Sequence, residues 1–154
     1  MHITGEWGAR CLLLSLLVSP LRKWTGWSTV LKLRRMLGLF AFFYATVHLT
    51  SFAHFYVGWT VSILVEELLE RPYITLGFAA WLLMLPLAVT STRGMQRRLR
   101  KNWQRLHRLV YPVAVFVCAH IIWQVRSDAG EALLYLVLFF GLLLWRYFRF
   151  RQRA

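Results

Sequence analysis

Two histidines lie deep inside long apolar runs of the sequence. His48 and His120 each fall about 13 residues into such a run, roughly 20 Å from its start at the helical rise of about 1.5 Å per residue. Both runs are expected to cross a bilayer in the same direction, so the imidazoles are predicted to lie at one depth. Ionisable groups inside a membrane are costly and are candidates for function. Two neutral imidazoles facing each other across a helical bundle suit a six-coordinate haem iron.

A second level of candidates lies nearer the start of the same helices. His107 begins the run that contains His120, and Arg34 and Arg35 precede the earlier run at the same level. A guanidinium has no free lone pair for iron, so the arginines are predicted to pair with haem propionates. His107 and His120 are 13 residues apart, which points them about 140° apart on an ideal helix. Pro112 between them can kink or rewind that helix.

Each histidine also has a purely structural interpretation. A lone intramembrane histidine often holds neighbouring helices together by hydrogen bonds. His107 stands beside Arg105 and Arg108 at a predicted membrane interface, where a histidine is usually solvated. His54 is six residues from His48, which places it on a different helical face, so it is not predicted to be a ligand.

The elements that must position these residues are five apolar segments. A helix needs about 20 apolar residues to cross a bilayer core of roughly 30 Å. The first segment is the weakest, because it contains Glu6 and Arg10, which can pair at a spacing of four. Residues 58–69 are expected to form a short amphipathic helix on the outer surface. The sequence therefore predicts one all-α domain over residues 1–154, a polytopic transmembrane bundle with helices at about 3–21, 36–58, 73–90, 107–125 and 130–148.

The distribution of charge predicts the orientation of that bundle. Lys and Arg number 19 against 6 Asp and Glu, a balance that could suggest nucleic acid. The basic residues, however, fall in short runs between the apolar stretches, as in the cytoplasmic loops of membrane proteins. The alternating loops carry Glu66, Glu67 and Glu70 instead. We therefore expect lipid and no nucleic acid as a partner, with the N-terminus outside and the C-terminus cytoplasmic.

The sequence offers little for catalysis on a substrate. It contains no Gly-rich phosphate loop, no HExxH and no Ser–His–Asp set, and no catalytic residue is predicted. Cys11 and Cys118 form no CxxC or CxxCH motif and are expected to be small buried hydrophobic residues. Without a nucleotide-binding domain the chain cannot take hydride from NAD(P)H by itself.

Several motifs in order resemble one family. They are LRRMLGLFAFFYATVHLTSF (33–52), RPYITLG (71–77), TSTRGMQRRLRKNWQRLHRLVY (90–111) and His120. They resemble the MsrQ (YedZ) family, the haem-binding membrane subunits of periplasmic protein-methionine-sulfoxide reductase systems, within the ferric reductase-like transmembrane superfamily. The likeness runs from about residue 3 to the C-terminus. Family members usually have another helix before the segment that here starts at Met1.

The resemblance implies a function and a set of ligands. It implies one or two b-type haems, with His48 and His120 matching the outer pair and His107 the inner histidine. Where the wider superfamily has a second inner histidine, this chain has Arg34. The family passes electrons from the quinone pool or a cytosolic flavin reductase across the bacterial inner membrane to MsrP, a periplasmic molybdopterin enzyme that repairs oxidised methionine, and FMN is also associated with it. The chain is then the electron-transfer subunit of an oxidoreductase system, rather than its catalytic subunit.

Two other functions remain open at this point. The first is a stand-alone transmembrane reductase that acts directly on ferric iron or quinone. The second is a haem-free membrane anchor or assembly factor, in which the histidines only hold helices together.

Overall fold

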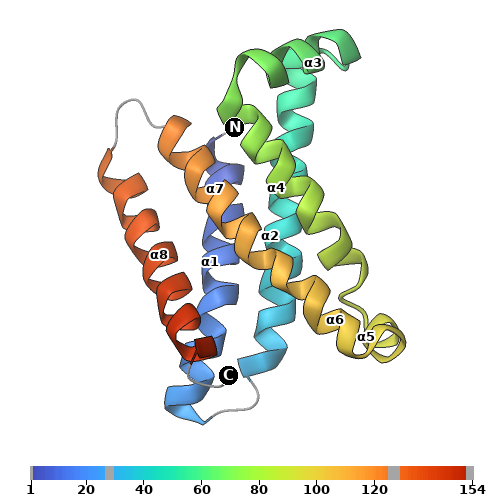
Figure 1. Cartoon of the computed structure of the whole chain (residues 1–154). Coiled ribbons are helices and arrows are strands. Elements are labelled where there is room, and N and C mark those ends of the chain that lie inside the picture. Colours follow the sequence, from blue (N-terminus) through green and yellow to red (C-terminus); the bar gives the residue numbers. More distant parts are fainter. Residues whose placement is uncertain (1, 27–29, 125–128, 152–154) are drawn as a thin grey trace.

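The regular structure of the chain is helical. The computed structural model describes residues 2–26, 30–124 and 129–151, and every regular element in that part is a helix, as Figure 1 shows. The all-α prediction is confirmed. The α-helices are α1 (His2–Thr25), α2 (Val30–Phe52), α3 (Val61–Glu70), α4 (Pro72–Val89), α5 (Arg93–Leu99), α6 (Lys101–Leu106), α7 (Val110–Gln124) and α8 (Ala129–Arg151). A π-helix, Ala53–Val57, continues α2, and a 3-10 helix, His107–Leu109, precedes α7.

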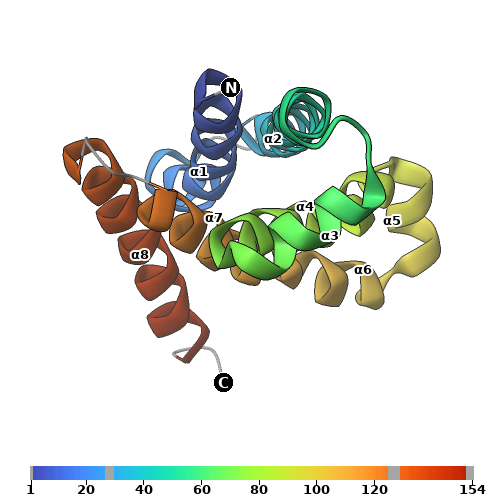
Figure 2. The same cartoon turned by 90° about the horizontal axis from the view of Figure 1, so that it is seen from above.

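The long helices pack side by side as a bundle. Helix α1 packs along α2, α4 packs along α7, and α2 also contacts α4. Helix α8 closes the bundle against α1 and α7, an arrangement visible from above in Figure 2. The start of α1 lies at the same end of the molecule as α3, while α5, α6 and the end of α8 lie at the other end (Figure 1). The acidic and the basic segments thus occupy opposite ends of the bundle.

Within the described residues, three stretches are long and apolar enough to cross a membrane. They are Lys32–Val57, Pro72–Val89 and Lys101–Gln124, which correspond to the second, third and fourth predicted spans. Helix α8 contains a shorter apolar stretch, Leu133–Trp145. Helix α1 has 24 residues but is not among the three, in keeping with its charged pair. Membrane crossing by α1 and α8, and the direction of the chain, stay predictions.

Several boundaries differ from the sequence-based ones for local reasons. Helix α1 continues past Pro20 and ends where Gly26 takes a φ of +72° and its N–H bonds the Arg22 carbonyl at 2.9 Å. Such a left-handed glycine is a common helix end. Helix α2 begins at Val30, so the basic residues before position 36 belong to the helix and not to a loop. Val125, the last residue of the fourth predicted span, lies outside the described residues.

The basic connection after α4 is also helical, which was not predicted. Helices α5 and α6 are built mostly from Arg, Lys, Leu, Met and Gln, all of which have good helix propensity. Thr92 begins α5 as its N-cap, because its side chain accepts a hydrogen bond from the Met95 N–H at 3.3 Å. The predicted amphipathic helix is present as α3. A prediction based on apolar runs finds membrane helices but passes over short polar ones.

A small apolar core ties α8 to the rest of the bundle. Leu16 of α1, Val113 of α7 and Phe139 of α8 are its most completely buried large side chains. Cys11 belongs to the same core, Cys118 packs against it partly buried, and both cysteines are free. The core lies between the helices that border the cavity described next.

Candidate cofactor-binding site

A cavity of about 510 Å³ opens between α1, α2, α4 and α7. Its wall is mostly apolar, with few polar side chains, and its size falls in the usual range of small-molecule sites, about 300–1,000 Å³. Both candidate histidines border it. The principal lining side chains around them are Ala41, Ala45, Leu49 and Phe52 of α2, Phe78, Trp81 and Met84 of α4, and Val117 and Ile121 of α7.

The structure brings His48 and His120 together across this cavity. Their ring centroids are 6.3 Å apart, and the ring planes are inclined at 80°. With metal–nitrogen bonds of about 2 Å and half a ring added on each side, two imidazoles on opposite sides of one metal ion have centroids roughly 6 Å apart. The spacing expected of a six-coordinate metal with two axial imidazoles is therefore met by two rings from different helices.

Hydrogen bonding fixes which nitrogen of His120 is free. Its Nδ1 lies 2.6 Å from the backbone carbonyl oxygen of Tyr73 in α4. A carbonyl only accepts, so Nδ1 carries the proton and Nε2 keeps its lone pair for a metal. A histidine ligand whose other nitrogen donates to a carbonyl is the usual arrangement at metal sites. His48 has a longer contact, 3.4 Å from Nδ1 to the hydroxyl of Thr4 in α1.

His107 lies in a different place from the histidine pair. Its ring stacks on Trp103 with centroids 3.9 Å apart, and its Nδ1 lies 3.1 Å from the Trp103 carbonyl oxygen. The charge of Arg34 acts on this ring across the gap between α2 and the start of the α7 segment. That Arg34 and His107 form one site at the same level stays a prediction. His107, Arg34 and the exposed Arg35 are not among the residues that line the cavity.

The 3-10 turn changes the angle around the helix axis between the side chains of His107 and His120. His107–Leu109 is wound as a 3-10 helix before α7 begins, and a 3-10 helix has about 3.0 residues per turn instead of 3.6. Pro112 has no N–H to give to the carbonyl four residues earlier, which favours a break at this point. The helix is rewound on the His107 side of Pro112, so the ideal-helix angle of the sequence analysis does not apply.

His54 lies outside the site. Its side chain is exposed, and its Nδ1 accepts a hydrogen bond from the Trp59 indole N–H at 3.2 Å. It is not among the residues that line the cavity. The expectation that it points away from His48 agrees with this placement.

Arg71 borders the cavity at the start of α4. Its guanidinium pairs with the Glu67 carboxylate at 3.3 Å. A hydrogen bond with Tyr73 and the negative charge of Glu67 raise the pKa of Arg71 above its usual value, so it keeps its charge. The sequence analysis did not single out Arg71 or Tyr73 as site residues. Both lie within the RPYITLG motif, which was the available signal.

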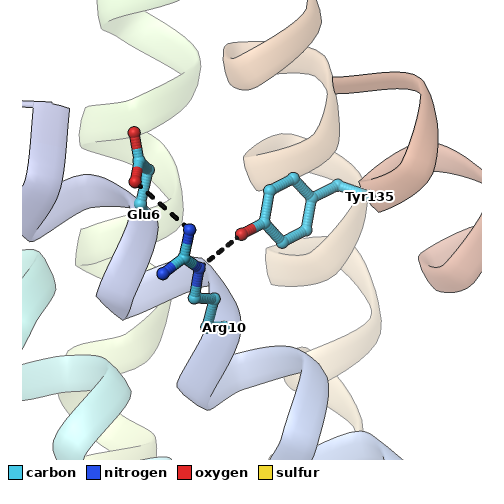
Figure 3. Close-up of polar contacts among 3 residues, drawn as sticks. All are labelled: Glu6, Arg10 and Tyr135. Carbon is cyan, nitrogen blue, oxygen red and sulfur yellow. Dashed lines mark hydrogen bonds and ion pairs between the residues drawn. The ribbon is translucent and has the colours of Figure 1, made fainter. Parts of the chain in front are cut away.

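A polar cluster of three residues holds α8 to α1 beside the cavity. Arg10 donates from Nε to the Tyr135 hydroxyl at 2.8 Å and from Nη2 to the Glu6 carboxylate at 3.4 Å. Figure 3 shows the guanidinium between its two partners. Arg10 also lies over the Trp7 ring, 5.3 Å from its centroid. The predicted Glu6–Arg10 pair is present, and Tyr135, which lines the cavity, is its unpredicted third member.

The Arg10–Tyr135 bond should contribute measurably to stability. In a double-mutant cycle of Arg10→Met and Tyr135→Phe, we expect a coupling free energy of about 0.6 kcal/mol, with roughly 1.7 kcal/mol as the upper bound for bonds between membrane helices. Reversible unfolding of the detergent-solubilised protein measures it. Strictly additive effects of the two substitutions would mean that the bond does not hold α8 in place.

Comparison with known proteins agrees with this architecture. The family model described as "Ferric reductase like transmembrane component" matches residues 4–118. A protein of Xanthomonas axonopodis pv. citri, named protein-methionine-sulfoxide reductase heme-binding subunit MsrQ, is 51% identical over 94% of this chain and 66% of its own length. A Klebsiella pneumoniae protein of the same name is 43% identical over 98% of this chain and 75% of its own. No solved structure gives a match.

The three apolar helices of membrane-spanning length in the described part of the chain define a polytopic helical membrane protein, and two of them bring His48 and His120 together. The chain belongs to the ferric reductase-like transmembrane family and, within it, to the MsrQ group. It spans just under two thirds, 66%, of the length of the Xanthomonas relatives.

Proposed function

We propose that the chain holds b-type haem between His48 and His120 and passes electrons across the bacterial inner membrane to MsrP, for the repair of oxidised periplasmic proteins. The observation that carries the proposal is the 6.3 Å separation of the two rings across an apolar cavity. The names of the relatives, which are called haem-binding subunits of a methionine sulfoxide reductase, support it independently.

The residues around the cavity fit such a group. His48 and His120 would supply the two axial nitrogens, and the Tyr73 carbonyl would orient the second. The apolar side chains would exclude water from the iron. Such a wall stabilises a change in the charge of the iron less than a polar wall does, and this difference tunes the reduction potential. The haem supplies one-electron redox chemistry when bound, and the protein supplies ligands, orientation and a dry surrounding.

A second group of residues, nearer the predicted cytoplasmic end, completes the proposed electron path. His107, with Arg34 and Arg35, would serve a second haem or the propionates at the cytoplasmic end, where the quinone pool or a cytosolic flavin reductase delivers electrons. The effect of the Arg34 charge on the His107 ring supports grouping these residues. An FMN is expected from the family resemblance alone, and we assign no residue of this chain to it.

A reoxidation experiment tests the proposed partner. The purified full chain is loaded with haem, reduced with one equivalent of dithionite and mixed with MsrP and a peptide containing methionine sulfoxide. We expect the reduced absorption band to decay much faster than with the peptide alone, because the peptide can oxidise the haem only through MsrP. Equal decay rates in the two mixtures would remove MsrP as the partner.

One observation favours a second candidate, a stand-alone ferric reductase. The matching family model describes a ferric reductase component. In the same assay, a soluble ferric chelate replaces MsrP and the peptide. Faster and saturable reoxidation by the chelate would favour direct iron reduction, whereas slow, non-saturable reoxidation would leave the subunit function in place.

A further inference from the structure

A glycine lies directly beneath each imidazole of the pair. A β-carbon added to Gly77 of α4 would lie 2.9 Å from both Cε1 and Nδ1 of His120, closer than real β-carbons come to other atoms. A β-carbon on Gly5 of α1 would lie 3.2 Å from Cε1 and Nδ1 of His48. In each case the three nearest atoms belong to the histidine ring. Both rings therefore lie against the backbone of a neighbouring helix, at a position where any side chain would crowd the ring.

The hydrogen bond of His120 explains why the contact falls at position 77. In an α-helix the carbonyl of residue 73 points along the axis toward the N–H of residue 77. A second donor that reaches the same carbonyl from the side must pass beside residue 77. The His120 ring does this, with Nδ1 2.6 Å from the Tyr73 oxygen. A side chain at position 77 would occupy the space through which the ring reaches its acceptor.

We propose that Gly77 and Gly5 are positioning residues for the cofactor, because they let the two imidazoles lie against α4 and α1 with their planes nearly perpendicular. This inference rests on the proposed haem site between His48 and His120. The feature that the two glycines are proposed to maintain is the 80° angle between the ring planes. Gly77 is the stricter of the two, since 2.9 Å demands a displacement of the ring, whereas 3.2 Å demands only a small adjustment.

The main experiment compares Gly77→Ala with Gly38→Ala, since nothing lies within 4 Å of a β-carbon at Gly38 of α2. Haem titration of the purified full chain should show about 10–100-fold weaker affinity for Gly77→Ala, the usual loss when an outer partner of a metal ligand is removed. Gly5→Ala should lose less, and Gly38→Ala should bind as the unmodified protein does.

Two spectroscopic readouts separate positioning from general damage. Perpendicular axial imidazoles give low-spin ferric haem a highly anisotropic electron paramagnetic resonance spectrum with one large g value, and we expect it in the unmodified protein and in Gly38→Ala. In Gly77→Ala the large g value should decrease as the His120 ring turns. The haem midpoint potential should rise, because a ring that loses its Nδ1–H bond to a carbonyl is a less basic ligand.

The experiment remains decisive if Gly77→Ala folds poorly. The three nearest atoms to the added methyl group are all in the His120 ring, so the double variant Gly77→Ala/His120→Ala should fold as well as His120→Ala alone. Equal destabilisation by Gly77→Ala in both backgrounds would overturn the inference, as would a Gly77→Ala protein with unchanged affinity, resonance spectrum and potential. If His120→Ala itself leaves the low-spin spectrum unchanged in intensity, the proposed haem site fails instead, which is a different result.

Discussion

Replacing His120 by alanine should eliminate the low-spin spectrum of the haem held between His48 and His120. The His120 ring is oriented by the Tyr73 carbonyl, its Nε2 is the nitrogen that would hold the iron, and its centroid lies 6.3 Å from that of His48. Without it the iron would keep at most one axial imidazole and could not remain six-coordinate through protein nitrogens. The reduced-minus-oxidised absorption spectrum of protein purified with added haem measures the change.

His54→Ala is the matched control for this substitution. His54 follows His48 along the same chain segment, but its side chain is exposed and bonded to Trp59. Its removal should leave the spectrum unchanged, whereas His48→Ala should reproduce the effect of His120→Ala. A low-spin spectrum that is unchanged in intensity in both His48→Ala and His120→Ala would show that neither histidine holds the iron.

Replacing Phe139 by alanine should cost about 3 kcal/mol of unfolding free energy, at the lower end of the range for buried aromatic residues. Phe139 is fully buried between α8 and the core residues Leu16 and Val113. In lipid the driving force is lost packing contact and not transfer from water, which is why the lower end applies. Chemical unfolding of the detergent-solubilised protein, followed by circular dichroism, measures the loss.

The neighbouring residue provides the control for Phe139. Phe140 is 63% exposed on the other face of α8, and Phe140→Ala should change the unfolding free energy by less than about 0.5 kcal/mol. Similar losses for the two substitutions would mean that α8 does not pack on the bundle through the Phe139 face.

Much of the site could be predicted from depth alone. His48 and His120 lie equally far into two runs that cross in the same direction, and the fixed helical rise then places them at one level. The structure brings these two rings together. The same reasoning placed Arg34 at the level of His107, and the Arg34 charge acts on the His107 ring. These features follow from one-dimensional spacing, which the sequence contains directly.

The features that could not be predicted depend on contacts between helices. Gly77 and Tyr73 become important only because α7 packs on α4 and brings His120 to that stretch of backbone. Tyr135 joins the Glu6–Arg10 pair only because α8 folds back on α1. The helical winding around His107 depends on a 3-10 turn. A calculation that assumes an ideal α-helix throughout cannot include such a turn.

The account depends most directly on the haem content of the unmodified protein. The full chain is purified with haem supplied in excess, and its helical content, haem-to-chain ratio and reduced-minus-oxidised spectrum are recorded. We predict a low-spin b-type spectrum with at least one haem held by each chain. A fully helical, folded protein that retains no haem would contradict the account and leave the histidines as residues that only join helices.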